Sequence, residues 1–256
     1  MWGIYASSGD PWTTESEKDI LLIVRITDKA AVDSPKRFLF NNFARIGSAL
    51  ANPARLELLD LLAQGEKTVD RLASQARLSV KNTSAHLRRL RQAALVTNRK
   101  EANWVFYRLA DPAVNDLVAS LQHVGRRQLA EVRELVRDYF ADPKGFEPIG
   151  LEELAGRLGD GTVTLLDVRP ADEYAHGHIP GAVSVPVAGL AARIAELPRS
   201  GEIVAYCRGP YCLLAVEAAG LLRQHGFRVR RLAEGMPAWA GRGLPVAVGG
   251  GEEIPA

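Results

Sequence analysis

Two cysteines, Cys207 and Cys212, lie close together near the middle of the second half of this 256-residue chain, and it contains no others. An apolar strand pattern runs into Cys207, a short loop with Gly and Pro follows, and a helical pattern covers about 212–224. A thiol at the end of a strand and beside a helix N-terminus is favoured as the thiolate. A thiolate in this position is a nucleophile or a redox sensor.

The composition, with 47% hydrophobic and 24% charged residues, is typical of a soluble globular protein, and the length suggests two domains. No apolar run approaches the length of a membrane span, so we expect no membrane partner. The first residues lack the basic flank and cleavage site of a signal peptide. Two cysteines without an export signal predict the reducing cytoplasm and chemistry, not a structural disulfide framework.

The charge is unevenly distributed along the chain. Residues 36–110 carry 14 Lys and Arg against 5 Asp and Glu, whereas residues 150–256 carry 10 against 12. The first half is therefore basic enough to attract phosphates. A solvated basic face without a partner is the alternative.

The basic half shows the order of elements of a winged helix-turn-helix unit. Side chains suited to cap helices precede the helical patterns. Near residue 95 the spacing of the apolar residues changes from that of a helix to that of a strand. The predicted elements are a helix opened by Asn52 and Pro53, a short helix 69–75 capped by Thr68, a helix capped by Ser79 that runs to about Ala93, and two strands, 95–97 and 104–107, around the turn 101–103.

Residues 79–90, Ser-Val-Lys-Asn-Thr-Ser-Ala-His-Leu-Arg-Arg-Leu, followed by Leu95 and Val96, resemble the recognition helix and wing of ArsR-type bacterial repressors. The resemblance covers about 36–110, and the upstream run 52–56, Asn-Pro-Ala-Arg-Leu, also fits it. One departure is Ala94, where the family usually has a turn glycine.

The second helix of such a unit lies in the major groove, with its N-terminal residues toward the base edges. We interpret Thr83, Leu87 and Leu90 as core residues, and a packing or capping role for His86 stays open. The candidates for reading bases are Lys81, Asn82, Ser84 and His86, and those for holding phosphates are Arg88, Arg89 and Arg91, with Arg99 and Lys100 on the wing.

Apolar residues then recur every three or four positions from Val114 to Tyr139. This pattern predicts one helix of about 30 residues, which is too long for a single small domain. We interpret it as a dimerisation helix, with packing inside the same chain as the alternative. A homodimer suits an inverted-repeat operator in double-stranded DNA, since its two recognition helices can address two half-sites.

ArsR-type relatives often sense metals through paired thiolates or through Asp and His clusters. The helix that follows Thr68 contains no Cys, and His123 has no partner at the spacing of metal ligands. We therefore predict neither a metal site nor a cofactor.

The second half alternates short apolar strands with helical stretches, which predicts an α/β fold with a largely parallel sheet. The predicted strands are 163–168, 182–185, 203–206 and 229–232, so the cysteine loop follows the carboxyl end of a strand. The predicted organisation is an N-terminal extension 1–35, a winged helix-turn-helix and dimerisation domain 36–140, a linker 141–149, the α/β domain 150–247 and a tail 248–256.

The α/β half resembles a single rhodanese domain over nearly all of 150–245. The matching residues are Leu-Asp-Val-Arg at 166–169, Glu-Tyr at 173–174, Gly-His-Ile-Pro-Gly-Ala at 177–182, Cys207, and Gly-Met-Pro-Ala-Trp at 235–239. The resemblance implies that Cys207 accepts sulfane sulfur as a persulfide and passes it to a thiol. It also implies supporting roles for Asp167 and Arg169 around the loop, and a structural role for His178.

The loop departs from the usual sulfurtransferase pattern, which has Gly at the third position after the Cys and Arg at the fifth. Here Pro210 and Cys212 occupy those places, so the anion clamp is weakened, and Arg208 is the candidate to replace it in part. The related phosphatases need an Arg where Leu213 stands. The departure adds a second thiol, because Cys212 can resolve a Cys207 persulfide or sulfenic acid as a disulfide if the loop brings them together. A small buried residue is the alternative for Cys212.

Three functions remain open. The preferred hypothesis is a DNA-binding repressor whose rhodanese half senses a sulfane-sulfur donor or an oxidant through Cys207. The second is a sulfurtransferase enzyme with a DNA-binding module, and the third is an arsenic sensor that uses both thiolates.

Overall fold

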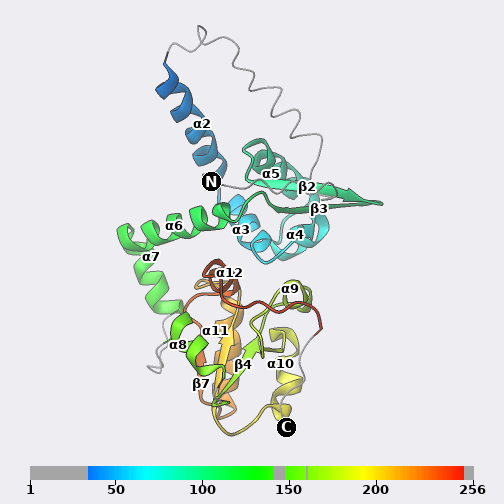
Figure 1. Cartoon of the computed structure of the whole chain (residues 1–256), viewed down its shortest axis with the longest axis vertical. Helices are drawn as coiled ribbons and strands as arrows, with labels where there is room; N and C mark the ends of the chain where they lie inside the picture. The colour runs from blue at the N-terminus through cyan, green and yellow to red at the C-terminus, as the bar shows by residue number, and fades with distance from the viewer. Residues whose placement is uncertain (1–33, 141–147, 160, 251–256) are drawn as a thin grey trace. The chain divides into compact units, whose positions relative to one another are not determined.

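The computed structural model describes residues 34–140, 148–159 and 161–250 (Figure 1). The predicted extension 1–35, the linker 141–149 and the tail 248–256 lie mostly outside these residues. The chain divides into two compact units, one made of residues 1–62 and 66–114, the other of residues 63–65 and 115–256.

The first unit is a winged helix-turn-helix. Its elements are α2 (Pro35–Leu50), α3 (Pro53–Leu62), β1 (Lys67–Thr68), α4 (Val69–Gln75), α5 (Val80–Gln92), β2 (Val96–Glu101) and β3 (Trp104–Leu109). The predicted caps Thr68 and Ser79 are confirmed, because their side chains accept from the backbone N–H groups of Arg71 and Asn82, each at 3.2 Å. Asn52 caps α3 in the same way, with the Arg55 N–H at 3.2 Å. Each helix therefore begins where a local oxygen satisfies an otherwise unpaired N–H group.

Strands β2 and β3 form the wing of this unit. They are antiparallel, with Val96 opposite Leu109 and Glu101 opposite Trp104, and β1 pairs with the other edge of β3. Ala102 turns the hairpin with a φ of 49°, and Ala94 enters the wing with a φ of 57°. Ala94 thus takes the left-handed conformation that favours glycine.

The core of the first unit consists of leucines from three helices. Leu58 of α3, Leu72 of α4 and Leu87 and Leu90 of α5 are all fully buried. Each contributes roughly 1.5–3 kcal/mol by leaving water. Thr83 is also fully buried, and its hydroxyl donates to the Ser79 carbonyl oxygen at 3.0 Å. The interpretation of Thr83, Leu87 and Leu90 as core is therefore confirmed.

The single helix predicted from Val114 to Tyr139 is wrong in one respect. The structure has α6 (Ala113–Gln128), α7 (Ala130–Leu135) and a π-helical turn, η1 (Val136–Phe140), with Leu129 between α6 and α7 in an extended conformation (φ −96°, ψ 118°). The Arg133 guanidinium donates to the Arg127 carbonyl oxygen at 2.7 Å. This bond satisfies a terminal carbonyl of α6. The apolar repeat of the sequence therefore continues, although the backbone helix is interrupted.

The second unit contains a four-stranded parallel sheet in the order β5-β4-β6-β7. Its strands are β4 (Val163–Asp167), β5 (Val183–Ser184), β6 (Glu202–Tyr206) and β7 (Val229–Arg231), at the predicted positions. The helical elements are α8 (Leu151–Arg157), α9 (Ala171–His176), α10 (Val187–Arg193), η2 (Ile194–Glu196), α11 (Leu213–Gln224) and α12 (Met236–Gly241). The α/β fold with a parallel sheet is therefore confirmed.

The second unit has a core on each face of the sheet. Ile203 and Ala205 of β6 pack with residues of α10 and α11, such as Leu190 and Leu222. Val204 and Tyr206 pack on the opposite face, in the same cluster as Trp239 of α12. This alternation continues to Cys207, which belongs to the first of the two clusters and is 1% exposed.

Candidate functional site

The cysteine loop runs from the end of β6 to the first residue of α11. Cys207 follows Tyr206 directly, and its carbonyl oxygen accepts a hydrogen bond from the Met236 N–H at 3.1 Å. Cys212 is the N-cap residue of α11, and its N–H donates to the Gly209 carbonyl oxygen at 3.1 Å. The two cysteines form a disulfide with their Cα atoms 6.3 Å apart, which lies within the range for such bonds. The loop thus brings the two thiols within bonding reach.

Gly235 supports this loop from the start of α12. A Cβ atom at Gly235 would lie 2.2 Å from the Arg208 carbonyl oxygen and 2.4 Å from the Gly209 nitrogen. Both contacts are with backbone atoms, which cannot move aside as a flexible side chain can. Only glycine therefore allows the two backbones to approach this closely.

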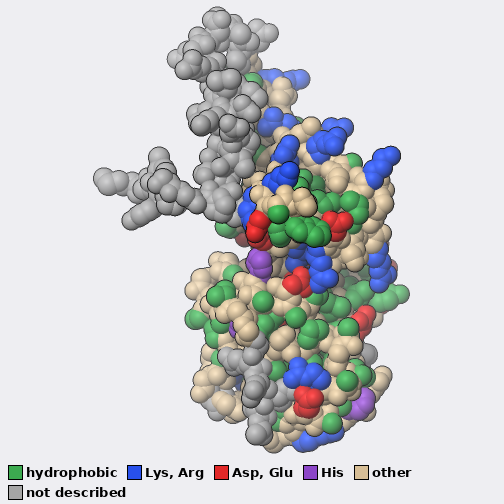
Figure 2. Space-filling view, turned by 90° about the vertical axis from the view of Figure 1, so that its right-hand side faces the viewer, with side chains coloured by type: hydrophobic (Ala, Val, Ile, Leu, Met, Phe, Trp, Pro, Cys, Tyr) green, Lys and Arg blue, Asp and Glu red, His purple; other side chains and the backbone are tan. Residues whose placement is uncertain are grey.

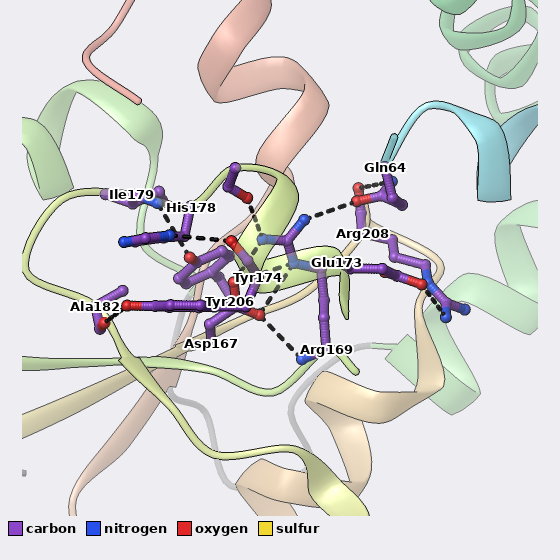
Figure 3. A network of polar contacts seen from close by, with 11 residues as sticks. Gln64, Asp167, Arg169, Glu173, Tyr174, His178, Ile179, Ala182, Tyr206 and Arg208 are labelled. Atoms are coloured by element: carbon purple, nitrogen blue, oxygen red, sulfur yellow. Dashed lines mark hydrogen bonds and ion pairs between the residues drawn. The ribbon is translucent and has the colours of Figure 1, made fainter. Parts of the chain in front are cut away.

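Arg208 is bound to a buried carboxylate. Its Nε and one terminal nitrogen donate to the two carboxylate oxygens of Glu173 on α9, at 2.9 and 2.8 Å (Figure 3). The Glu173 side chain is fully buried and that of Arg208 is 16% exposed. An anion at the cysteine loop would have to compete with Glu173 for this guanidinium. The sequence assigns no role to Glu173, although this residue is among those that resemble a rhodanese domain.

Asp167 and Arg169 form a second ion pair at the end of β4, and both side chains are fully buried. The Arg169 guanidinium donates to both Asp167 carboxylate oxygens and, at 2.7 Å, to the Gly177 carbonyl oxygen (Figure 3). Burial lowers the pKa of Arg169, but the hydrogen bond and charge of Asp167 outweigh it, so the pKa lies above its usual value. The pair ties the end of β4 to the segment that begins with Gly177.

Tyr206 joins the same network at the end of β6. Its hydroxyl oxygen accepts a hydrogen bond from the Ile179 N–H at 3.1 Å. Burial raises the pKa of Tyr206, and the nearby Asp167 carboxylate raises it further. The phenol therefore stays protonated, and the residue before Cys207 is held by a neutral contact.

His178 lies in the interior of the domain. Its ring stacks on that of Tyr174 with centroids 3.7 Å apart, and its Nδ1 lies 3.0 Å from the Tyr174 carbonyl oxygen (Figure 3). The backbone groups of His178 and Ala247 exchange two hydrogen bonds of 2.9 Å. The side chain is 2% exposed, and these contacts fit the structural role that the sequence predicts for it.

The recognition helix α5 presents most of its predicted DNA-binding residues to solvent. Lys81, Asn82, Arg88 and Arg89 are exposed, while Ser84 and His86 are half-buried. Arg91 is exposed, and its guanidinium donates to the Asn98 side chain on β2 at 2.9 Å. The face shown in Figure 2 carries several Lys and Arg side chains on this unit.

The two basic residues of the wing differ in their surroundings. The Arg99 guanidinium donates to both Glu66 carboxylate oxygens, at 3.1 and 2.6 Å, and to Glu101, and it lies 4.4 Å from the centre of the Phe106 ring. The hydrogen bond that Arg99 donates to Glu66 is the main cause that raises the pKa of Arg99. Lys100 is exposed. A phosphate contact by Arg99 would therefore compete with Glu66, whereas Lys100 is accessible.

Within the described residues, no group of three or more His, Cys, Asp and Glu side chains could hold a metal ion. None of the helices in this part of the chain is long and apolar enough to cross a membrane.

Comparison with known families matches both units. Residues 52–98 match the bacterial regulatory protein family arsR, and residues 150–242 match the rhodanese-like domain. The fold and the two sites thus define an ArsR-type regulator that carries a C-terminal rhodanese domain.

The HTH-type transcriptional regulator Rv0324 of Mycobacterium tuberculosis is 44% identical over 214 residues, which are 84% of this chain and 94% of that protein. The chain belongs to this family of transcriptional regulators. A sulfurtransferase of Allochromatium vinosum is 38% identical over 100 residues, which are 38% of this chain and 92% of that protein. Among solved structures, the homodimeric winged helix-turn-helix DNA-binding domain from Mycobacterium bovis is 38% identical and covers 40% of this chain and 94% of its own, with a TM-score of 0.37.

Proposed function

We propose that this regulator is a repressor whose rhodanese unit senses reactive sulfur species or oxidants through Cys207. The observation that carries the proposal is the pairing of Cys207 with Cys212 between β6 and α11. A bacterial DNA-binding regulator works in the cytoplasm, where structural disulfides are rare and reversible ones serve sensing or catalysis. The pair is therefore expected to open and close.

The chemistry proceeds in two steps. The Cys207 thiolate attacks the sulfane sulfur of a persulfide donor, forms a Cys207 persulfide and releases the donor as a thiolate. The Cys212 thiolate then attacks the Cys207 sulfur, closes the disulfide and releases hydrosulfide. The two cysteines lose two electrons, and the sulfane sulfur gains them. With peroxide, Cys207 instead becomes a sulfenic acid. The Cys212 thiolate then attacks its sulfur, closes the disulfide and displaces hydroxide.

The sulfurtransferase function is the second candidate, favoured by the similarity of the second unit to the Allochromatium vinosum sulfurtransferase. Two features of the loop favour sensing instead. Arg208 is engaged by Glu173, so the loop lacks an unengaged guanidinium to clamp an anionic donor. Cys212 is placed to close a disulfide before a persulfide on Cys207 reaches an external acceptor.

An arsenic sensor is a weaker candidate. Thiolate sites for this element need a third ligand, and the described residues contain no cluster of three such side chains.

The test is mass spectrometry of the wild type, Cys207→Ser and Cys212→Ser after treatment with polysulfide, together with binding to an operator selected from random duplex DNA. We expect the wild type to form the disulfide and lose affinity for DNA. Cys212→Ser should keep a persulfide on Cys207 and respond weakly or reversibly. Release of DNA by treated Cys207→Ser would refute the sensing function, whereas repeated turnover of thiosulfate with no change in DNA affinity would favour the enzyme.

The DNA-binding form is a homodimer in this proposal. Helix α6 has an inner face, with Val114 and Val118 buried, and an outer face on which Leu117, Leu121 and Val124 are 40–55% exposed. The outer residues recur at helical spacing, so they form an apolar stripe that a second copy can cover. Helix α2, in the first unit, has exposed aromatic rings of its own, Phe38, Phe40 and Phe43.

Sedimentation at micromolar concentration tests the dimer. The wild type should sediment at twice the chain mass of 27.8 kDa. The double variant Leu121→Glu and Val124→Glu should sediment as the monomer, because two carboxylates per copy cannot be buried without partners. Leu213→Glu, at an exposed position on α11, is the matched control and should remain dimeric. A wild type found only at the monomer mass contradicts the dimer.

A further inference from the structure

The residue before Cys212 contacts the helical segment that precedes the rhodanese domain. The rings of Tyr211 and Phe140 meet edge to face, with centroids 5.8 Å apart and planes at 82°. Phe140 is the last residue of η1. A residue inside the cysteine loop thus touches the end of the segment formed by α6, α7 and η1, and both residues belong to the second unit.

A second contact holds the same end of η1 against the sheet. The guanidinium of Arg231 on β7 donates to the Phe140 carbonyl oxygen. Arg231 lies opposite Ala205 in the parallel ladder, two residues before Cys207. Phe140 is therefore fixed from the neighbouring strand, while its ring rests on the loop.

The position of Tyr211 depends on whether the cysteines are bonded. The disulfide closes a ring of residues 207–212 and ties Cys212 to the buried Cys207. Opening it removes the covalent tie at Cys212, while the ion pair of Arg208 with Glu173 and the turn between Cys212 and Gly209 remain. Since Tyr211 directly precedes Cys212, its backbone is among those that the bond restrains most.

We propose that Tyr211 transmits the state of the Cys207–Cys212 pair to Phe140, and through it to the α6–α7–η1 segment. The proposal rests on the proposed function for the chemistry that closes the pair. In the bonded state the Tyr211 ring is held against Phe140 and η1 is docked. In the dithiol state the ring is released and η1 exchanges between docked and undocked positions. Leu129 has an extended backbone between α6 and α7, so a movement of η1 and α7 either reaches α6 through this residue or is taken up by its backbone dihedral angles.

Hydrogen–deuterium exchange of residues 130–140 in the full chain tests this coupling. The bonded form is compared with the form reduced by dithiothreitol, in which two thiols form and the reagent becomes a cyclic disulfide. We expect exchange of this segment to rise about two- to tenfold on reduction, the range that corresponds to the loss of one aromatic pair. An unchanged exchange rate in the wild type would overturn the proposal.

Variants of the two rings separate this route from others. Tyr211→Ala and Phe140→Ala should show, in both redox states, the faster exchange that the wild type shows after reduction. Tyr211→Phe should behave like the wild type, because the contact is made by the ring. Tyr139→Ala, which removes a neighbouring ring that is 63% exposed, is the matched control and should keep the redox difference. A redox difference that persists in both Tyr211→Ala and Phe140→Ala would overturn the proposal.

A failure of the proposed function can be distinguished from a failure of this coupling. If the redox difference in exchange is present but DNA affinity does not change between the two forms, the coupling stands and the sensing function fails. Phe140 lies outside the strands and helices of the rhodanese domain, so Phe140→Ala keeps the test informative even if Tyr211→Ala disturbs the loop.

Discussion

The carboxylate of Glu173, fully buried on α9, receives two hydrogen bonds from Arg208, the residue next to Cys207. The two members of the pair are not equivalent, because Arg208 retains a path to water and Glu173 does not. Removing Arg208 leaves a buried charge without its main partner, whereas removing the charge of Glu173 lets the guanidinium turn toward solvent. The position of Arg208 in the loop beside Cys207 thus depends on the buried carboxylate of Glu173.

This asymmetry predicts unequal losses of stability. Arg208→Met should lower the free energy of unfolding by about 3 kcal/mol or more, as expected for a broken buried pair. Glu173→Gln should cost about 1–2 kcal/mol, close to the cost of a weakened hydrogen bond. The double variant should be more stable than Arg208→Met alone. Urea denaturation of the reduced protein, followed by circular dichroism, gives the ranking, and equal losses for the two single variants would contradict it.

The recognition helix separates reading of bases from holding of phosphates. Asn82→Ala should reduce discrimination between operator and random DNA by about 1–3 kcal/mol if the contact is bidentate. The double change Arg88→Ala and Arg89→Ala should weaken binding to all sequences alike and flatten the salt slope by about one unit per lost contact in each half of the dimer. Fluorescence anisotropy at several salt concentrations measures both effects.

The control for these variants is Gln92→Ala, an exposed position at the end of the same helix, which should change neither quantity. Equal losses on operator and random DNA for Asn82→Ala would reject its role in reading bases.

The wing provides a matched pair of adjacent basic residues. Lys100 is exposed, whereas Arg99 is engaged by Glu66 and Glu101, so alanine substitutions of the two residues are expected to have different effects. Lys100→Ala should flatten the salt slope of DNA binding by about one unit per half of the dimer. Arg99→Ala should instead increase amide exchange across β2 and β3, with a smaller effect on the salt slope. The reverse pattern would show that Arg99 leaves its carboxylates to bind phosphate.

Features that depend on neighbouring residues were predictable from the sequence. The caps at Asn52, Thr68 and Ser79 each act on an N–H three residues away, and the strand that ends before Cys207 contains the apolar run 203–206. The break at Leu129 was not predictable, because the apolar repeat passes through it unchanged while the Arg133 bond ends α6.

The surroundings of the loop depend on pairs that are distant in the sequence. Glu173 and Arg208 are 35 positions apart, and Arg231 and Phe140 are 91 apart. No local period encodes such pairs, since they follow from which helix covers which strand end. For this reason the sequence identified Cys207 and Cys212 but not the partner of Arg208 or the contact of Tyr211.

Ala94 offers a test of backbone conformation at the entrance to the wing. Its φ of 57° is left-handed, it is exposed, and its methyl group therefore contributes little packing to offset the strain. The left-handed conformation costs a residue with a Cβ atom about 1–2 kcal/mol, and glycine loses about 0.5–1 kcal/mol in chain entropy. Ala94→Gly should thus raise the free energy of unfolding by up to about 1.5 kcal/mol.

The neighbouring residue is the matched control for Ala94→Gly. Ala93 is buried and has a φ of −90°, so Ala93→Gly gains no relief of strain and should lower the free energy of unfolding by about 0.5–1 kcal/mol. Thermal melts of the two variants and the wild type should place Ala94→Gly highest and Ala93→Gly lowest. The same loss in both variants would mean that Ala94 is not strained, and that the turn into the wing tolerates alanine without cost.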